Sequence, residues 1–244
     1  MRALENLGSF LLFVVLAVLS ACSASMPSKN LNGAKKPANF YYEVDVSDST
    51  ENMNNPVVAK AVADRIAADA RKMVQLGDTI HVYEAGARTA ERMVAHPPFA
   101  TDYNLRVPAA VTKLTEQMDA IAARYRREGG DTSTNLLLTL QSMKPECTPR
   151  STVVLVTDAL EESDAVSTTR ALNANRPVLL PAPSSKFLAG CRVVLVGFGL
   201  TGDPESDKGQ LLPETMLGNL RRGWLTYLQQ AGVDPAQVEF VSLL

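Results

Sequence analysis

The sequence has few of the residues that build the commonest metal sites and nucleic-acid interfaces. Two His and three scattered Cys among 244 residues cannot form a Cys/His zinc site of the usual spacing. The 24 Lys and Arg are balanced by 26 Asp and Glu, which gives a formal net charge of −2. Because nucleic-acid binding requires many cations that neutralise phosphates, we expect no nucleic-acid partner. The hydrophobic content of 46% excludes a disordered polymer and predicts a globular protein.

The N-terminus lacks an apolar run long enough to cross a membrane. The run from Phe10 to Leu19 has about half of the roughly 20 residues that a spanning helix needs, and it predicts the core of a signal peptide. It ends in Leu19-Ser20-Ala21-Cys22, which resembles the bacterial lipobox, whose Cys is lipidated and becomes the first mature residue. An ordinary signal peptide with a nearby Cys is the alternative. The resemblance implies a protein that is anchored to a membrane through Cys22 and does not span it.

Three segments follow from this interpretation. Residues 1–21 are the predicted lipoprotein signal peptide, residues 22–39 the lipidated Cys and a flexible tether, and residues 40–244 the folded domain. The tether is predicted because this stretch is small, polar and interrupted by Pro and Gly. In bacterial lipoproteins, a residue such as Ser23 after the Cys, in place of Asp, favours the outer membrane. We therefore expect the domain to face the periplasm.

Strand and helix patterns alternate along the predicted domain. Apolar segments typical of strands begin near residues 39, 79, 151, 191 and 238, with a weaker one within 87–96. Apolar residues at helical spacing follow Pro56, Pro108 and Pro213, and a shorter helix is expected near Thr134. The longest irregular stretch covers 173–187. This alternation predicts a single α/β domain with a doubly wound, mostly parallel central sheet flanked by helices.

Polar motifs follow the predicted strands and begin one predicted helix. The first strand runs into Asp45-Val46-Ser47-Asp48-Ser49, a D-x-S-x-S motif that by itself is also typical of a capped turn. Thr134-Asn135-Leu136 lies at a loop–helix junction, and Thr157-Asp158 ends the fourth strand. In this order, the three motifs resemble the von Willebrand factor type A domain, an arrangement that also occurs in integrin inserted domains. The resemblance covers the chain from about Asn39 to the C-terminus.

The resemblance implies a metal-ion-dependent adhesion site where the first and fourth strands end side by side. Its ligands are all hard oxygens, which suit Mg²⁺ or Mn²⁺. In the family the hydroxyls bind the metal directly, the carboxylates often act through water, and one position is left for an acidic side chain of a protein partner. Thr132 is an alternative to Thr134, and Ala159 stands where the family often has Gly. The implied ligands are Asp45, Ser47, Ser49, Thr134 and Asp158.

Other readings of these segments are weaker. Gly197 to Gly202 spell G-x-G-x-x-G, but this dinucleotide fingerprint should open a helix in the first strand–helix unit, and here it follows the penultimate strand. Asp45 could suggest a phosphohydrolase, but that family needs a second Asp where Ser47 stands, and the sequence has no G-x-S-x-G or P-loop. The acidic side chains Glu161, Glu162 and Asp164 form either a solvated run or an acidic rim to the metal site.

Two of the three Cys each precede an apolar strand. In the family's strand order these strands are neighbours, which implies a disulfide between Cys147 and Cys191; two buried free thiols are the alternative. In an oxidising periplasm, closing about 45 residues would stabilise the fold by roughly 4 kcal/mol in the chain-entropy model.

The function that follows is a lipid-anchored, non-enzymatic adhesion or scaffold module that binds an unknown protein partner through a divalent cation. An assembly or structural envelope lipoprotein with an idle metal site is the first alternative. A periplasmic phosphohydrolase is a remote one. No organic cofactor is expected.

Overall fold

The computed structural model describes residues 36–47, 50–86, 94–129, 133–203 and 206–243. The predicted signal peptide, Cys22 and nearly all of the predicted tether lie outside this part of the chain. A compact unit begins at Pro37, and its first strand begins at Asn39. None of the helices in these ranges is both long and apolar enough to cross a membrane.

The core of the unit is a seven-stranded sheet of order β3-β2-β1-β5-β6-β9, with β4 also paired to β2. Every pairing among β2, β1, β5, β6 and β9 is parallel, and only the two-residue β3 and β4 run antiparallel. The predicted α/β fold with a mostly parallel sheet is therefore confirmed. The strands are β1 Asn39–Asp45, β2 Thr79–Ala85, β3 Val94–Ala95, β4 Phe99–Ala100, β5 Thr152–Val156, β6 Arg192–Val196 and β9 Val238–Val241.

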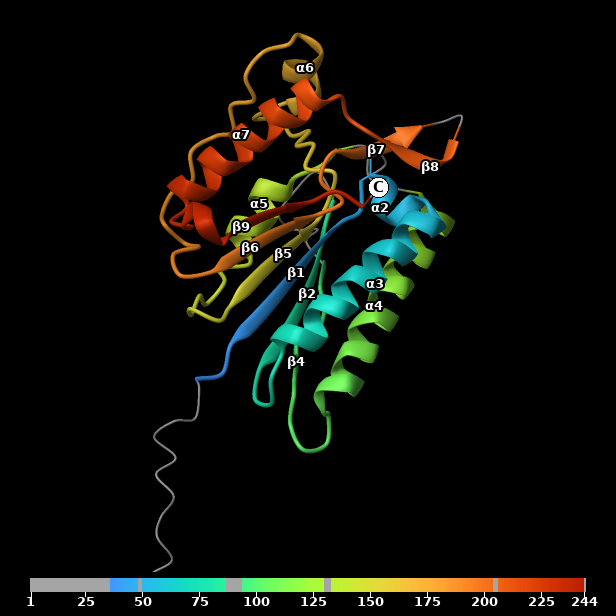
Figure 1. Ribbon diagram of the computed structural model, residues 1–244, viewed down its shortest axis with the longest axis vertical. Coiled ribbons are helices and arrows are strands. Elements are labelled where there is room, and N and C mark those ends of the chain that lie inside the picture. Colours follow the sequence, from blue (N-terminus) through green and yellow to red (C-terminus); the bar gives the residue numbers. More distant parts are fainter. Residues whose placement is uncertain (1–35, 48–49, 87–93, 130–132, 204–205, 244) are drawn as a thin grey trace, which may run out of the picture. The chain divides into compact units, whose positions relative to one another are not determined.

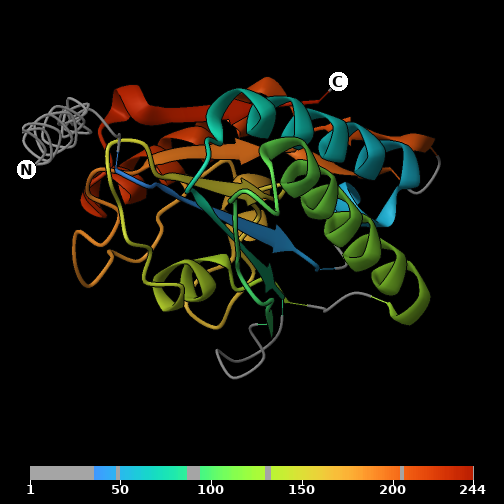
Figure 2. The ribbon, with the colours of Figure 1, turned by 90° about the horizontal axis from the view of Figure 1, so that it is seen from below.

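Helices cover both faces of the sheet (Figures 1 and 2), with α3 and α4 on one face and α5 and α7 on the other. Side chains alternate along a strand, so Val154 and Val156 of β5 pack under α3 and α4, whereas Val153 and Leu155 pack under α5 and α7. The sheet is thus buried on both sides. The helices are α3 Pro56–Met73, α4 Val107–Glu128, α5 Leu136–Ser142 and α7 Glu214–Gln230.

The long helices begin and end at residues with suitable backbone chemistry. Asn55 caps α3 by accepting hydrogen bonds from the amides of Val57 and Val58, and Pro56 occupies the first position, where no amide hydrogen is needed. α4 ends at Gly129, whose φ of 83° lies in the region that favours glycine.

The amino ends of the strands are fastened by a disulfide. Cys147 and Cys191, 44 positions apart, are bonded ahead of β5 and β6. This is the pairing that the family resemblance implies, and it ties the two central strands together before either one enters the sheet.

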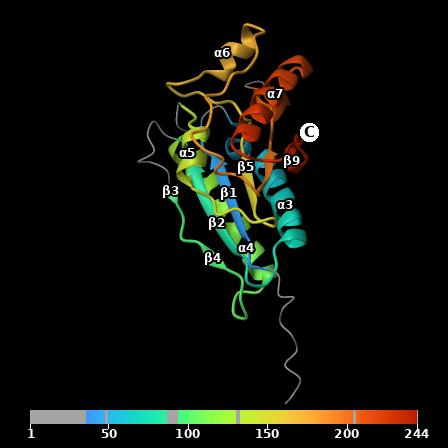
Figure 3. The same cartoon turned by 90° about the vertical axis from the view of Figure 1, so that its left-hand side faces the viewer.

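Several short elements were not predicted. A two-stranded hairpin follows β6, the fourth parallel strand in chain order. It was not predicted because its pairing depends on backbone hydrogen bonds and its polar sequence has little alternation. α6 lies beyond the carboxyl ends of the strands (Figures 1 and 3). These elements are α2 Glu51–Asn54, α6 Thr168–Asn173, β7 Leu200–Asp203, β8 Ser206–Leu211 and the 3-10 helix Pro235–Gln237.

Candidate functional site

Asp45 is fixed at the carboxyl end of β1. The parallel register pairs Val44 with Val156 of β5 and so places Asp45 beside Thr157. The side chain of Asp45 is fully buried; its Oδ1 accepts a hydrogen bond from the Ser47 amide at 2.9 Å and its Oδ2 accepts one from the Thr157 hydroxyl at 2.7 Å. A carboxylate has about four acceptor positions, so both oxygens retain capacity for a further donor or a cation.

Three of the other predicted ligands are also buried at this edge of the sheet. Ser47 and Thr134 are each 1% exposed, and Asp158 is fully buried, with its Oδ1 accepting from the Leu160 amide at 2.8 Å. Thr134 exchanges two backbone hydrogen bonds with Glu162, of 3.1 and 3.2 Å, which tie the loop before α5 to the loop after β5. Ser49, the fifth predicted ligand, lies outside the described residues, as does the alternative Thr132.

The turn after Asp158 has a left-handed backbone at Ala159, the position at which the type A resemblance leads one to expect Gly. Ala159 has a φ of 69°, a left-handed conformation that costs an L-residue roughly 1 kcal/mol. The conformation is held by two hydrogen bonds: the Ala159 amide donates to the Thr157 hydroxyl at 2.8 Å, and the Trp224 indole donates to the Ala159 carbonyl at 2.8 Å. Ala159 therefore holds a backbone conformation that Gly would adopt more easily.

The site contains more buried carboxyl groups than the motif predicts. Glu43, two positions before Asp45 on the same face of β1, is fully buried, and neither of its carboxylate oxygens makes a hydrogen bond to a described residue. Burial raises its pKa well above the ordinary value, and the charges of Glu161 and Asp45 raise it further. Burial also raises the pKa of Asp45 to about 6, against the hydrogen bonds from Thr157 and Ser47.

The prediction that Glu161, Glu162 and Asp164 form a solvated run is wrong for Glu161. It is fully buried, not solvated, because its Oε2 accepts the amide hydrogens of Leu136 and Leu137, at 2.9 and 3.3 Å, at the start of α5. Burial raises its pKa to about 7, against these amides and the nearby Ser163 hydroxyl. The solvated reading holds only for Asp164, which is exposed.

Sequence reasoning missed two members of this acidic group for different reasons. Glu43 could have been found, because it is the one charged residue inside an otherwise apolar strand and shares the face of Asp45 by simple alternation. Glu161 could not, because its burial depends on where the loop after β5 meets α5. Among the described residues, Glu43, Asp45 and Glu161 form no ion pair with Lys, Arg or His.

The G-x-G after β6 lies against the proposed site and is followed by a strand, not by a helix. Gly197 has a φ of 86°, and a Cβ there would lie 2.1 Å from Oδ1 of Asn52 in α2. The Gly199 amide donates to the Asp158 carbonyl at 2.9 Å. Strand β7 follows at Leu200, so the turn lacks the helix N-terminus on which a pyrophosphate would sit.

The donor set suits a hard cation. Within the described ranges, no three His, Cys, Asp or Glu side chains are grouped so that they could hold a metal ion, so a carboxylate-rich cage or a zinc site is not formed there. The predicted set differs, because it combines two carboxylates with hydroxyls, all of them oxygen donors of the kind that Mg²⁺ accepts while keeping some of its waters.

The comparisons with known proteins are distant. No family model matches the sequence, and no curated protein matches it. Among solved structures, an aerotolerance-related membrane protein from Bacteroides fragilis has a TM-score of 0.44 at 11% identity, over 84% of this chain and 90% of that one. The pilus adhesin SpaC from Lactobacillus rhamnosus GG has a TM-score of 0.45 at 11% identity; 85% of this chain is covered, but only 28% of the adhesin. An uncharacterised membrane-spanning protein from Vibrio fischeri has a TM-score of 0.26 at 14% identity, over 84% and 92% of the two chains. These values describe a distant likeness in the arrangement of strands and helices, from which nothing about function follows.

Proposed function

We propose that this protein is a non-enzymatic binding module that engages a protein partner through Mg²⁺ or Mn²⁺. The observation that carries the proposal is the placement of Asp45: a fully buried carboxylate, oriented by Ser47 and Thr157, with no ion pair to a described cationic side chain. A buried carboxylate without a counter-charge is costly. A divalent cation held by Asp45, Ser47, Ser49, Thr134 and Asp158 would supply that charge.

The cation would also create the partner's binding point. In the type A domains that the motifs resemble, the metal keeps one position open for an acidic side chain of the partner. Here the neighbouring Glu43 and Glu161 are buried acids as well. They strengthen the attraction for a cation and disfavour a second carboxylate unless the metal is bound. Partner binding is therefore expected to require the metal strictly.

The three Cys residues support a proposal for the cellular setting. The disulfide between Cys147 and Cys191 favours an oxidising compartment. The resemblance of residues 19–22 to a lipobox favours a lipid anchor on Cys22. We propose that the module is displayed at the bacterial cell envelope, on the periplasmic side of the outer membrane.

Isothermal titration calorimetry with Mg²⁺ and with Mn²⁺ tests the metal. We expect one saturable site in the wild-type protein and loss of that heat in Asp45→Asn, which keeps an acceptor for the Ser47 amide while removing the charge. Asp102→Asn is the matched control, because Asp102, like Asp45, accepts two hydrogen bonds, here from two backbone amides at 2.7 Å each, but lies in an exposed loop.

Partner binding is tested by affinity capture from envelope extract with Mg²⁺ and with EDTA. Proteins retained only with Mg²⁺, and lost with Asp45→Asn, support the proposal. Absence of saturable heat with both metals, together with capture that EDTA does not change, overturns it and favours an envelope lipoprotein that uses the same fold through other surfaces.

A further inference from the structure

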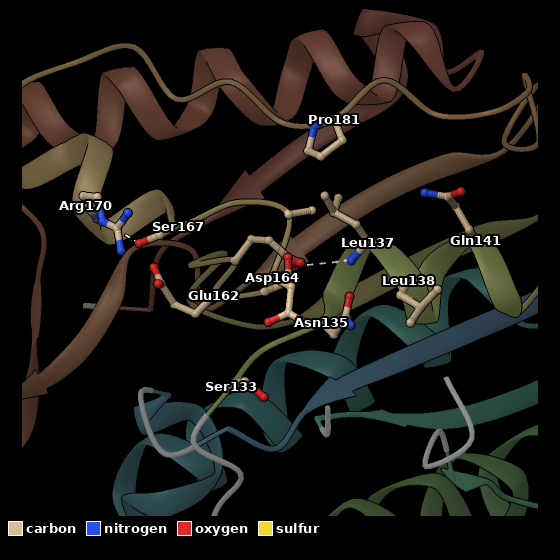
Figure 4. A pocket seen from close by; sticks show the side chains of 13 residues that line it. Ser133, Asn135, Leu137, Leu138, Gln141, Glu162, Asp164, Ser167, Arg170 and Pro181 are labelled. Atoms are coloured by element: carbon tan, nitrogen blue, oxygen red, sulfur yellow. Dashed lines mark hydrogen bonds between the residues drawn. The ribbon is translucent and has the colours of Figure 1, made fainter. Parts of the chain in front are cut away.

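A cavity of about 670 Å³ lies beside the proposed metal site. It opens between α5, the loop after β5, α6 and the irregular segment that follows α6 (Figure 4). Leu137, Leu138 and Gln141 project from α5 on one side, while Glu162 and Arg170 lie on the other. The volume is within the range of small-ligand sites and is ample for one long side chain.

The cavity is continuous with the loops that carry the proposed ligands. Ser133 and Asn135, which flank Thr134, both line it. Glu162, another lining residue, holds the backbone of Thr134 through two hydrogen bonds. A partner segment that reaches the metal would therefore meet this cavity within the next few residues.

The lining carries an excess of acid. Three carboxylates, those of Glu161, Glu162 and Asp164, face the same cavity as a single guanidinium, that of Arg170. Asp164 and Arg170 are both exposed, and no ion pair joins any of these four side chains to another described residue. A ligand with positive charge is favoured over a neutral or acidic one.

Glu161 supplies the specific acceptor. Its side chain is fully buried although it lines the cavity, so it belongs to the inner wall. Oε2 is occupied by the amides of Leu136 and Leu137, whereas Oε1 makes no hydrogen bond to a described residue. The Ser163 hydroxyl lies nearby and favours the ionised carboxylate, which lowers the pKa of Glu161 against the effect of burial. A buried carboxylate oxygen in this state is satisfied best by a charged N–H donor.

We propose that this cavity binds a basic side chain, Lys or Arg, of the protein partner. Leu137, Leu138 and Pro181 provide apolar wall for the aliphatic stem, and the carboxylates receive the charged end. Arg fits better than Lys, because its planar fork can donate to two carboxylates at once. The identity of the occupant as part of a protein partner rests on the proposed function; the preference of the cavity for a basic side chain does not.

The probe is N-acetyl-arginine amide, titrated into the ¹⁵N-labelled full-length protein in detergent and EDTA and followed by NMR. We expect saturable shifts of the Leu137, Asp164 and Arg170 amides, weaker binding of N-acetyl-lysine amide, and no saturation with N-acetyl-glutamine amide. Glu161→Gln should weaken arginine-amide binding at least fivefold while keeping an acceptor for α5, and Asp164→Asn about twofold. Glu116→Gln, exposed on the opposite helix layer, should leave it unchanged.

Two results overturn the inference: shifts with the arginine amide that match those with the glutamine amide, or arginine-amide affinity unchanged in both Glu161→Gln and Asp164→Asn. The NMR spectrum of Glu161→Gln shows whether this variant is folded. If it is not folded, the arginine-amide affinities of Asp164→Asn and Glu162→Gln decide whether the inference holds. EDTA is present throughout, so this test does not depend on the metal. If no metal binds in the calorimetry, the binding of arginine amide can still be measured, and if arginine amide does not bind, the metal proposal is unaffected.

Discussion

The two ends of the sheet treat buried carboxylates in opposite ways. At the amino ends of the strands, Asp78 is fully buried, and Arg150 donates to both of its oxygens, at 2.7 and 3.3 Å, while the amides of Ala38 and Gln75 complete the set. At the carboxyl ends, Glu43, Asp45 and Glu161 are equally buried, yet no described Lys, Arg or His pairs with any of them. One end holds a buried carboxylate with an arginine partner, and the other holds buried carboxyl groups that form no ion pair with a described residue.

Within one sheet, the amino ends of the strands carry contacts that stabilise the fold, and the carboxyl ends carry the proposed binding site. The amino ends also carry the disulfide, so both fastening devices stand where the loops have no proposed binding role. On the opposite helix layer, a buried acid near the carboxyl end of a strand is compensated: Glu84 of β2 faces α4 and is paired with His96 and Arg124. Among the described residues, buried acids without an ion pair are thus concentrated under α5 and α7 at the proposed site.

The largest expected effect is at the compensated end. Asp78→Ala should lower the free energy of unfolding by about 3–5 kcal/mol, because it leaves a partly buried Arg150 without its carboxylate and two amides without an acceptor. Urea denaturation followed by circular dichroism measures the loss. Asp102→Ala is the control: it also removes two amide hydrogen bonds, but in an exposed loop without an arginine, and should cost about 1 kcal/mol. Equal losses in the two variants would show that the Asp78–Arg150 pair adds nothing.

The sequence was sufficient for the features that depend on local pattern. Continuous apolar runs identify β5 and β6, helical spacing identifies α3, α4 and α7, and strand ends identify Asp45 and Asp158 as neighbours once the sheet order is known. The disulfide could be predicted only after the strand order was assumed, because Cys147 and Cys191 precede two strands that are neighbours in that order.

Features that depend on contacts between distant parts of the chain could not be predicted from the sequence. Asp78 and Arg150 are 72 positions apart, and nothing in either segment marks the pair. Glu161 reads as part of an exposed acidic run, and only the meeting of two loops buries it. The hairpin of β7 and β8 was missed because it is stabilised by backbone pairing between polar segments, which leaves no periodic apolar pattern.

The pH dependence of stability provides a second test of the uncompensated end. Glu161 faces Glu43, Asp45 and Tyr227, and its folded-state pKa is raised from 4.5 to about 7. The folded state therefore binds more protons than the unfolded state between these values, so the contribution of Glu161 to the free energy of unfolding falls as pH rises from about 4.5 to 7. In Glu161→Gln this contribution is absent. The variant should match the wild type near pH 4.5 and exceed it by up to about 3 kcal/mol at pH 8 without metal.

Thermal melts of both proteins in EDTA, from pH 4.5 to 8, measure this difference. Glu116→Gln, at an exposed position of α4, should show none at any pH. Saturating Mg²⁺ should raise the melting temperature of the wild-type protein most at high pH, because binding to the folded state stabilises it. A wild-type protein that gains stability relative to Glu161→Gln as pH rises would mean that Glu161 is compensated after all.

The smallest expected effect concerns Glu43 and, like that of Glu161→Gln, is a gain in stability. Glu43→Met removes a fully buried carboxylate that makes no hydrogen bond to a described residue and replaces it with an apolar side chain of similar length in the layer under α5 and α7. We expect the free energy of unfolding to rise by about 1–2 kcal/mol at pH 8, because the desolvation cost disappears without loss of a contact. Glu239→Met is the matched control on β9, where the acid is partly exposed and paired with Arg65 and Arg192; it should lose up to about 1 kcal/mol. A loss in Glu43→Met as large as that in Asp78→Ala would place Glu43 among the compensated acids and remove the contrast between the two ends of the sheet.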